Sequence, residues 1–232
     1  MIFKKGFLIE KFKEFPITYT LIILNILMFL STTISNDIRE SIFQTGGLNG
    51  YYVVLHGEIY RLLSSMFLHN DIIHISMNML SIYIVGRVVE HLFSTFAYLA
   101  IYFISGLFGN FAYIYLNPMD WAVGASGALF GVFGALAGFA FVHRQRMGRE
   151  FIAFMQNFGI VLLINFFIGI IFPNIAISAH VGGLISGVIG GFIIAKNPNY
   201  IWGYIVISMI ILWGVYGYLP SIYIDKVNSL SI

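Results

Sequence analysis

Residues 124–138 read GASGALFGVFGALAG, and residues 179–191 read AHVGGLISGVIGG. Both stretches are apolar, and both repeat a glycine every three or four residues. On a helix this spacing lines the glycines up in one stripe, the small-xxx-small pattern by which membrane helices approach closely. If the two stripes face each other, the backbones of these segments come into contact. The packing of this pair then decides how the rest of the chain is arranged.

The composition is typical of a protein embedded in a membrane. Of 232 residues, 59% are hydrophobic and only 9% are charged, and the mean hydropathy is +0.89. These values lie outside the range of soluble domains. Roughly 20 apolar residues make one helical crossing. Seven stretches are candidates: 17–34, 73–90, 96–116, 124–142, 151–172, 176–195 and 200–219. We therefore expect an all-α polytopic membrane protein, a bundle of seven transmembrane helices.

One long connection, residues 35–72, separates the first two spans, and the other connections are short. Within it, residues 55–69 carry apolar side chains at helical spacing but are too polar to span, so we expect this loop to be partly embedded in the interface. Arg61 there either anchors lipid headgroups or has a structural role inside the loop. We divide the chain into a cytoplasmic segment at 1–16, a six-helix core at 17–196, and an additional helix with its tail at 197–232.

The distribution of Lys and Arg predicts the orientation. With the N-terminus inside, nine of these residues lie on the inner side and three on the outer side: Lys4, Lys5, Lys11, Lys13, Arg87, Arg144, Arg146, Arg149 and Lys196 against Arg39, Arg61 and Lys226. No A-x-A-like cleavage site follows the first apolar stretch, which indicates a retained signal anchor. We expect a multi-pass protein of a bacterial plasma membrane, with its N-terminus in the cytoplasm and its C-terminus outside.

Charge and cysteine content exclude some functions. The net charge of +2 is too small, and too close to the spans, to suggest nucleic acid as a partner. The absence of cysteine excludes thiol catalysis and Cys-ligated metals.

In this orientation spans 2, 4 and 6 all begin at the outer side, and each begins with a polar residue at a similar depth. Span 2 carries His74 and Asn78, four residues apart and on one face. Span 4 carries Ser126, and span 6 carries His180. For Ser126 taken alone, helix packing is the favoured interpretation over chemistry, because a serine can bond back to its own helix at little cost. A histidine inside a membrane is costly and usually functional.

Close contact of the two glycine stripes would bring Ser126 toward hydrogen-bond reach of His180. That is the geometry of a nucleophile activated by a general base. His74 and Asn78 could then donate hydrogen bonds to an oxyanion.

Other catalytic motifs fit less well. The context G-A-S-G-A fails the G-x-S-x-G pattern at its last position, and the sequence predicts no strand–turn–helix unit around it. H-E-x-x-H does not occur, which argues against a zinc protease. Paired aspartates within the spans, which an intramembrane aspartyl protease would need, are also absent. All four aspartates fall in predicted loops: Asp37, Asp71, Asp120 and Asp225. His69, His74 and Asn78 form too short a ligand set for a metal. We expect no metal and no cofactor.

Taken together, the motifs resemble those of the rhomboid family of intramembrane serine proteases. GASG at 124–127, AHxxGxxxG at 179–187, and the run H-x4-H-x3-N beginning at His69 occur in family order on spans 4, 6 and 2. The resemblance extends over about residues 16–196 and implies a six-helix rhomboid core. The seventh span resembles the extra C-terminal helix found in part of the family, a 6+1 arrangement.

The resemblance implies roles for individual residues. Ser126 resembles the nucleophile and His180 its general base, in a dyad without a carboxylate. His74 and Asn78, together with the Ser126 backbone N–H, resemble the oxyanion hole. Gly124 resembles the residue that keeps the space beside the nucleophile open.

Other positions match supporting residues of the family. The glycines of the two motifs, Gly127, Gly183 and Gly187, support close helix packing. Phe130 stands where a tyrosine commonly stacks on the catalytic histidine, and Tyr60-Arg61 replaces a Trp-Arg pair. His69 matches a residue with a structural role.

We therefore expect a serine endopeptidase that cleaves transmembrane segments near the outer end of its bundle. Its partners would be the lipid bilayer and the transmembrane helix of a substrate, and its oligomeric state is open. We expect no acidic residue to reach His180, and Glu90, near Arg87, to stabilise the inner end. Two alternatives fit less well: an inactive rhomboid-like binder would normally have lost Ser126 or His180, and a transporter would show deep charges or inverted repeats.

Overall fold

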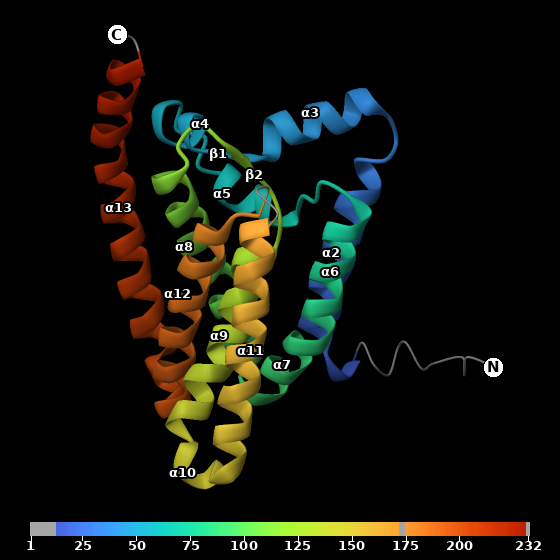
Figure 1. Cartoon of the computed structure of the whole chain (residues 1–232), viewed down its shortest axis with the longest axis vertical. Helices are drawn as coiled ribbons and strands as arrows, with labels where there is room; N and C mark the ends of the chain where they lie inside the picture. Colours follow the sequence, from blue (N-terminus) through green and yellow to red (C-terminus); the bar gives the residue numbers. More distant parts are fainter. Residues whose placement is uncertain (1–12, 172–174, 231–232) are drawn as a thin grey trace, which may run out of the picture.

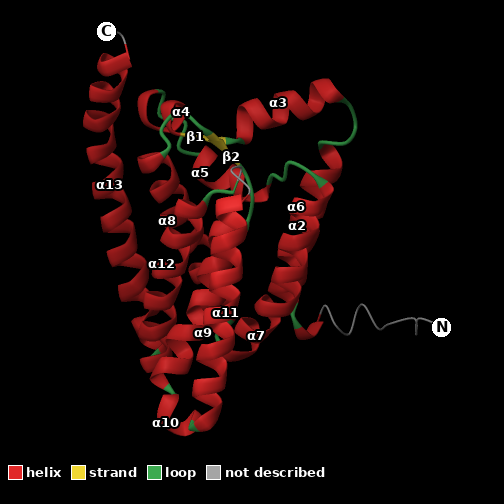
Figure 2. Ribbon diagram, viewed as in Figure 1, coloured by secondary structure: helices red, strands yellow, loops and turns green. Residues whose placement is uncertain are grey.

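The computed structural model describes residues 13–171 and 175–230, which are almost entirely helical (Figures 1 and 2). The described helices lie at the positions of the predicted spans, except that α13 extends eleven residues beyond its predicted end at residue 219. They are α2 (Pro16–Ser31), the continuous segment α6 (Ile72–Ser81), η2 (Ile82–Gly86) and α7 (Arg87–Leu92), then α8 (Thr95–Leu116), α9 (Ser126–Val142), α11 (Arg149–Ile171), α12 (Ile177–Lys196) and α13 (Ile201–Leu230). The element η2 is a π-helical turn.

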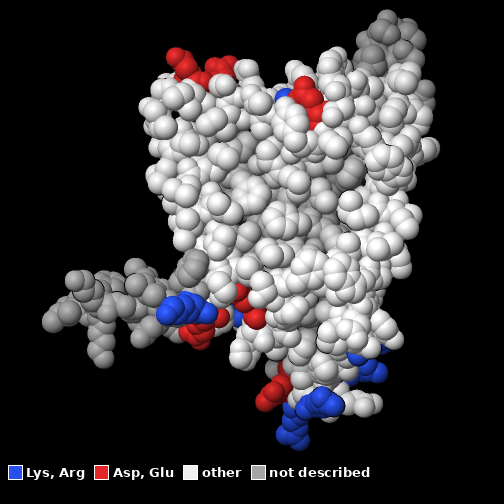
Figure 3. All heavy atoms as spheres, turned by 180° about the vertical axis from the view of Figure 1, so that it is seen from behind, with Lys and Arg blue, Asp and Glu red and all other residues white. Residues whose placement is uncertain are grey.

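Four of the described helices are long and apolar enough to cross a membrane: Ile72–Leu92, Thr95–Leu116, Ile177–Lys196 and Pro198–Ile224. The helices α2 and α9 are apolar but shorter. On the face drawn in Figure 3, charged side chains lie at the two ends and an uncharged band separates them. This confirms the predicted class, a helical membrane protein.

The connections contain short elements: α3 (Asn36–Gly46), β1 (Leu48–Asn49), α4 (Gly50–Leu55), α5 (Arg61–Ser64), η1 (Ser65–Phe67), β2 (Trp121–Ala122), α10 (Arg144–Met147) and η3 (Pro198–Tyr200). The strands β1 and β2 pair antiparallel, with Leu48 opposite Ala122 and Asn49 opposite Trp121. The sequence predicts no strand–turn–helix unit around Ser126, whereas the structure has the short strand β2 four residues before it. A two-residue strand is too short to show the alternation of apolar and polar residues that predicts a strand.

The centre of the molecule is the contact between α9 and α12, which lie side by side in Figure 1. A Cβ added to Gly183 would overlap the Gly127 carbonyl, and one added to Gly187 would overlap the Gly131 carbonyl. The two glycine stripes therefore face each other, which is the arrangement considered from the sequence. No larger residue fits at these positions without moving a backbone.

The third helix of the core is α8, which packs against both α9 and α12. A Cβ on Gly109 would lie 2.6 Å from the Ala179 carbonyl oxygen, so α8 also approaches closely. Nearer the start of α8, the side chains of Tyr98, Ile101 and Tyr102 are fully buried. These three helices form the rigid frame against which the remaining helices pack.

Glu90 of α7 binds the first turn of α2. Its carboxylate accepts hydrogen bonds from the backbone N–H groups of Ile17 (2.7 Å) and Thr18 (2.9 Å). The first N–H groups of a helix lack intrahelical partners and carry partial positive charge, so a carboxylate stabilises them. The sequence predicts that Glu90 stabilises the inner end of the bundle, near Arg87. In the structure the Arg87 guanidinium lies over the Tyr83 ring, 3.9 Å from its centroid.

The glycine contact predicts which helix substitutions are tolerated. Gly187→Ala should lower the free energy of unfolding by about 1–3 kcal/mol, because the new methyl group overlaps the α9 backbone. Gly203→Ala on α13 is the matched control, since a Cβ there has no atom within 4 Å. Thermal unfolding in detergent, followed by circular dichroism, compares the two. Equal melting temperatures would contradict the close contact.

Candidate active site

Ser126 and His180 lie in direct contact at one end of the core. Ser126 is the first residue of α9, and His180 lies in the first turns of α12. The Ser126 hydroxyl oxygen is 2.8 Å from Nε2 of His180. Because the glycine stripes hold the two backbones together below this point, the side chains meet without bending either helix. The hydroxyl can donate its proton when Nε2 is the unprotonated ring nitrogen.

The His180 ring is held from one face by Phe130. The two rings are stacked, with centroids 4.2 Å apart and an interplanar angle of 11°. Phe130 lies one helical turn after Ser126 on α9, so one helix carries both the hydroxyl and the stacking ring. The stack fixes the plane of the imidazole.

His74 and Asn78 of α6 point toward the segment that precedes Ser126. A side chain at Gly124 would begin 2.7 Å from Nε2 of His74 and 3.8 Å from the amide nitrogen of Asn78. Gly124 also has a φ of +131°, a conformation that L side chains rarely adopt. Only glycine therefore fits between this helix and the start of α9. Its N–H donates to the Ser65 carbonyl (2.9 Å), which ties this segment to the first loop.

Hydrogen-bond donors without partners lie near Gly124 and at the start of α9. The amide nitrogen of Asn78 is buried and has no partner among the described residues. The first backbone N–H groups of α9 are also free of intrahelical bonds, because the ladder of this helix begins with Leu129 bonding to Ala125. Unpaired donors at the positive end of a helix form a site for a negatively charged oxygen.

Acidic residues occupy other places. Asp71 caps α6 by accepting the His74 backbone N–H (2.8 Å). Glu90 of α7 accepts hydrogen bonds from the start of α2. In the described ranges, no hydrogen bond or ion pair joins a carboxylate to His180, and no group of three His, Cys, Asp or Glu side chains converges as a metal site.

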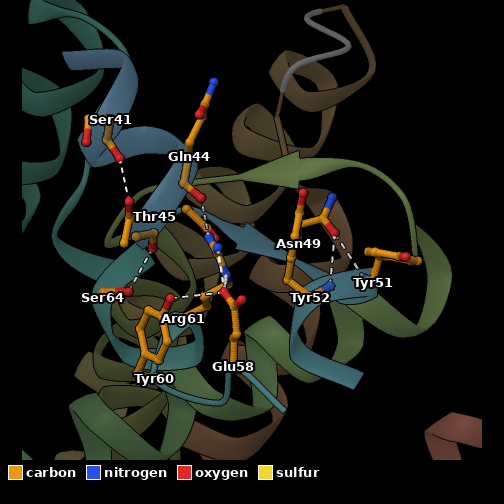
Figure 4. Close-up of polar contacts among 12 residues, drawn as sticks. Ser41, Gln44, Thr45, Asn49, Tyr51, Tyr52, Glu58, Tyr60, Arg61 and Ser64 are labelled. Atoms are coloured by element: carbon orange, nitrogen blue, oxygen red, sulfur yellow. Dashed lines mark hydrogen bonds and ion pairs between the residues drawn. The ribbon is translucent and has the colours of Figure 1, made fainter. Parts of the chain in front are cut away.

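Arg61 organises the loop above the site (Figure 4). It is 4% exposed and donates to the carbonyls of Gln44 (2.7 Å) and Gly47 (2.9 Å), and its guanidinium pairs with Glu58 at 2.6 Å. The hydrogen bond from Arg61 lowers the pKa of the Glu58 carboxyl. Of the two roles considered for Arg61, the structure therefore supports the structural one.

Sequence comparisons agree with the motifs. A family model described as the Rhomboid domain matches residues 56–197. This chain belongs to the Rhomboid family. The match covers the segment that carries His74, Asn78, Ser126 and His180, and it leaves α2, α3, β1, α4 and α13 outside.

Several curated proteins are similar to this rhomboid. Rhomboid protease GluP of Bacillus subtilis (strain 168) is 34% identical over 73% of this chain and 33% of its own length. RHOMBOID-like protein 4 of Arabidopsis thaliana is 31% identical over 68% of this chain and 39% of its own length. Putative rhomboid protease YdcA of Bacillus subtilis is 30% identical over 66% of this chain and 76% of its own length. The chain thus spans well under half the length of the first two relatives.

Sequence reasoning missed some residues that position this site in the rhomboid. Asn110 on α8 donates from its amide to the Leu62 carbonyl (2.7 Å) and to the Ser65 hydroxyl (3.2 Å). Asn49 donates to the Met119 carbonyl (2.9 Å) in the segment before Gly124. An amide inside a predicted span is a recognisable signal for Asn110. Nothing in the sequence marks Asn49, because its partner is 70 residues away.

His69 packs behind His74, with ring centroids 4.9 Å apart. It is 1% exposed, and neither ring nitrogen makes a hydrogen bond to a described residue. Burial, with a smaller contribution from the His74 ring, lowers the pKa of His69 to about 4. His69 is therefore neutral in the folded protein at neutral pH.

The buried His69 predicts acid sensitivity. Its pKa is lower in the folded than in the unfolded chain, so the unfolded chain binds more protons between about pH 6.5 and 4. Stability should be full above pH 6.5 and fall as the pH drops through this window. His69→Asn should lose less stability across the window than the parent protein. His56→Asn, which replaces an exposed histidine of the same loop, is the control. Melting temperatures from pH 7 to 4 test this, and identical slopes for parent and His69→Asn would contradict it.

Proposed function

We propose that this rhomboid is an intramembrane serine endopeptidase that cleaves transmembrane segments of other membrane proteins. Ser126 is the nucleophile and His180 the general base. The observation that carries this proposal is the 2.8 Å contact between the Ser126 hydroxyl and Nε2 of His180. The names of two relatives, Rhomboid protease GluP and Putative rhomboid protease YdcA, support the reaction class.

In the first step, Nε2 of His180 takes the proton of the Ser126 hydroxyl while the oxygen attacks the carbonyl carbon of the substrate peptide bond. The carbonyl oxygen becomes negative and accepts hydrogen bonds from the Asn78 amide, the His74 ring and the Ser126 backbone N–H. These donors are in place before the charge forms, so they stabilise the tetrahedral intermediate with little reorganisation.

In the second step, His180 gives its proton to the leaving amine and the peptide bond breaks, leaving an ester at Ser126. Water then attacks this ester with His180 again accepting the proton, and the hydroxyl is restored. Phe130 keeps the imidazole in one plane throughout, which is the orienting task that a carboxylate performs in a triad.

The substrate and the bilayer follow from the position of the site. Ser126 lies at an end of α9 and not at its middle, so water has a short path to it from the outer side. A substrate helix must unwind locally at the site before its carbonyl can be attacked, because helical carbonyls are already bonded. We therefore propose a transmembrane helix of another protein as the substrate and no nucleic-acid partner.

The proposal includes the membrane topology. All seven helices cross the membrane, with residues 1–16 in the cytoplasm, 17–196 as the protease core, 197–232 as an additional helix and tail, and the first loop partly embedded. Residues 1–12 and the side chains of residues 225–232 lie outside the described part. The described inner cations, which include Arg144, Arg146, Arg149 and Lys196, support this orientation. A bacterial plasma membrane is part of this proposal.

The dyad predicts the effect of losing either member. Ser126→Ala and His180→Ala should each lower turnover of a transmembrane substrate by at least about 10³-fold, because the two residues act as a unit. Folding should be unaffected by Ser126→Ala, since alanine fits the small-residue contact. The measurement is cleavage in proteoliposomes, combined with labelling by a serine-directed fluorophosphonate and mapping of the labelled residue. Label on a residue other than Ser126 would refute the assignment.

The same geometry predicts independence from carboxylates. Loss of the orienting acid costs a soluble triad on the order of 10⁴-fold in rate. Asp71→Asn, Asp120→Asn and Glu90→Gln should each keep turnover within about tenfold of the parent enzyme. Asparagine also caps helices, so Asp71→Asn should fold normally. Glu90→Gln should lower the melting temperature more than it lowers turnover, because the Glu90 carboxylate binds the start of α2. A folded variant of this set as inactive as Ser126→Ala would overturn the dyad.

A further inference from the structure

Helix α13 lies outside the matched Rhomboid segment, yet it packs along α8 and against α12 and α4 (Figure 1). Three of its tyrosine hydroxyls make hydrogen bonds to those helices. Tyr204 contacts the Ser186 hydroxyl of α12 (3.1 Å), Tyr216 donates to the Val53 carbonyl of α4 (3.4 Å), and Tyr223 donates to the Ile114 carbonyl of α8 (2.6 Å). The last two act at the end of the bundle that carries Ser126.

The bond from Tyr223 supplies a partner that the helix itself cannot. The Ile114 carbonyl would normally accept the N–H of the residue four positions later, but that residue is Pro118, which has no N–H. A buried carbonyl without a partner costs free energy. The Tyr223 hydroxyl, on a side chain only 1% exposed, satisfies this carbonyl. It thereby fixes the last turn of α8, from which the segment leading to Ser126 departs.

Tyr223 also contacts the start of α4. A Cβ on Gly50 would overlap the Tyr223 hydroxyl and would lie 2.7 Å from the Pro118 carbonyl oxygen. Gly50 is therefore wedged between α13 and the segment that follows α8. The position tolerates only glycine, so the three parts are in close contact.

From Gly50 the contacts continue to the candidate active site. The preceding residue, Asn49, donates to the Met119 carbonyl and pairs with Trp121 across the β1–β2 ladder. Trp121 accepts a further hydrogen bond on its carbonyl from the Tyr113 hydroxyl (3.2 Å). Gly124 follows shortly after and holds its strained φ beside His74. The 117–125 segment is thus held by α8, β1 and α13 together.

We propose that Tyr223 is a positioning residue for the active site: through Ile114 and Gly50 it holds the 117–125 segment so that Gly124 and the start of α9 keep their register beside His74 and Asn78. This inference rests on the proposed function. It makes α13 a working part of the enzyme, although the family model ends before it. A displacement of about 1 Å in a catalytic geometry can cost as much as 10²-fold in rate.

The test is Tyr223→Phe in the full-length protein, which removes the hydroxyl and keeps the ring. We expect kcat, counted per fluorophosphonate-labelled site, to fall roughly 3- to 30-fold with KM within about twofold. Tyr218→Phe on the same helix, where the side chain is 64% exposed, is the control and should match the parent. Tyr216→Phe is the second variant, and it should move kcat in the same direction by less, because its bond is longer.

Hydrogen–deuterium exchange provides a readout that does not depend on activity. In Tyr223→Phe, backbone amides in residues 117–125 should exchange faster than in the parent and in Tyr218→Phe. Unchanged exchange there, or unchanged kcat per labelled site in an active enzyme, overturns the inference. A lower labelled fraction with the parental kcat also overturns it, because that result indicates a merely structural role. A parent protein that neither labels at Ser126 nor cleaves substrate refutes the proposed function instead, and the exchange result still decides whether α13 holds the segment.

Discussion

The contact between the backbones of α9 and α12 is the constraint on which the rest of the structure depends. Gly183 and Gly187 face the carbonyls of Gly127 and Gly131 with no room for a side chain. In a membrane the surrounding lipid is as apolar as the helices, so association relies on close packing and not on the exclusion of water. Glycine permits the closest packing, and this pair therefore defines the centre around which α8 and the outer helices are arranged.

The geometry of the candidate site follows from that contact. Two helices locked along their length have little freedom at their ends, so the Ser126 hydroxyl and the His180 ring stay within hydrogen-bond distance. In soluble triads a carboxylate orients the histidine. Here the Phe130 ring lies flat against the imidazole instead, and no described carboxylate reaches it. A stacked ring restrains orientation without placing an additional charge in the low-dielectric interior, where charges are costly.

The loop between α2 and α6 is held by side chains that bind its backbone carbonyls. Buried Arg61 satisfies the carbonyls of Gln44 and Gly47, and Asn110 satisfies that of Leu62. Non-helical backbone leaves carbonyl and N–H groups without partners, and such groups are costly at membrane depth unless side chains bind them. The same requirement explains Tyr223, because Pro118 leaves the Ile114 carbonyl unpaired at the end of α8. Because Pro118 has no N–H, the Ile114 carbonyl stays free to accept a hydrogen bond from Tyr223 of α13.

The sequence by itself determined the helical membrane class, the approximate helix positions and a glycine stripe on each of two segments, because apolar length and the 3.6-residue period are local properties. Its motifs also indicated the Rhomboid family. That the two stripes face each other was decided by the tertiary structure. Only the tertiary structure decided the β1–β2 pairing, the binding of Glu90 to α2, the Arg61 contacts and the continuation of α13 to Leu230 beyond its predicted end at residue 219. Each of these depends on a partner distant in sequence, such as Asn49 with Met119 or Tyr223 with Ile114. A periodic pattern records which face of a helix is apolar, but it does not record which distant carbonyl a buried side chain will satisfy.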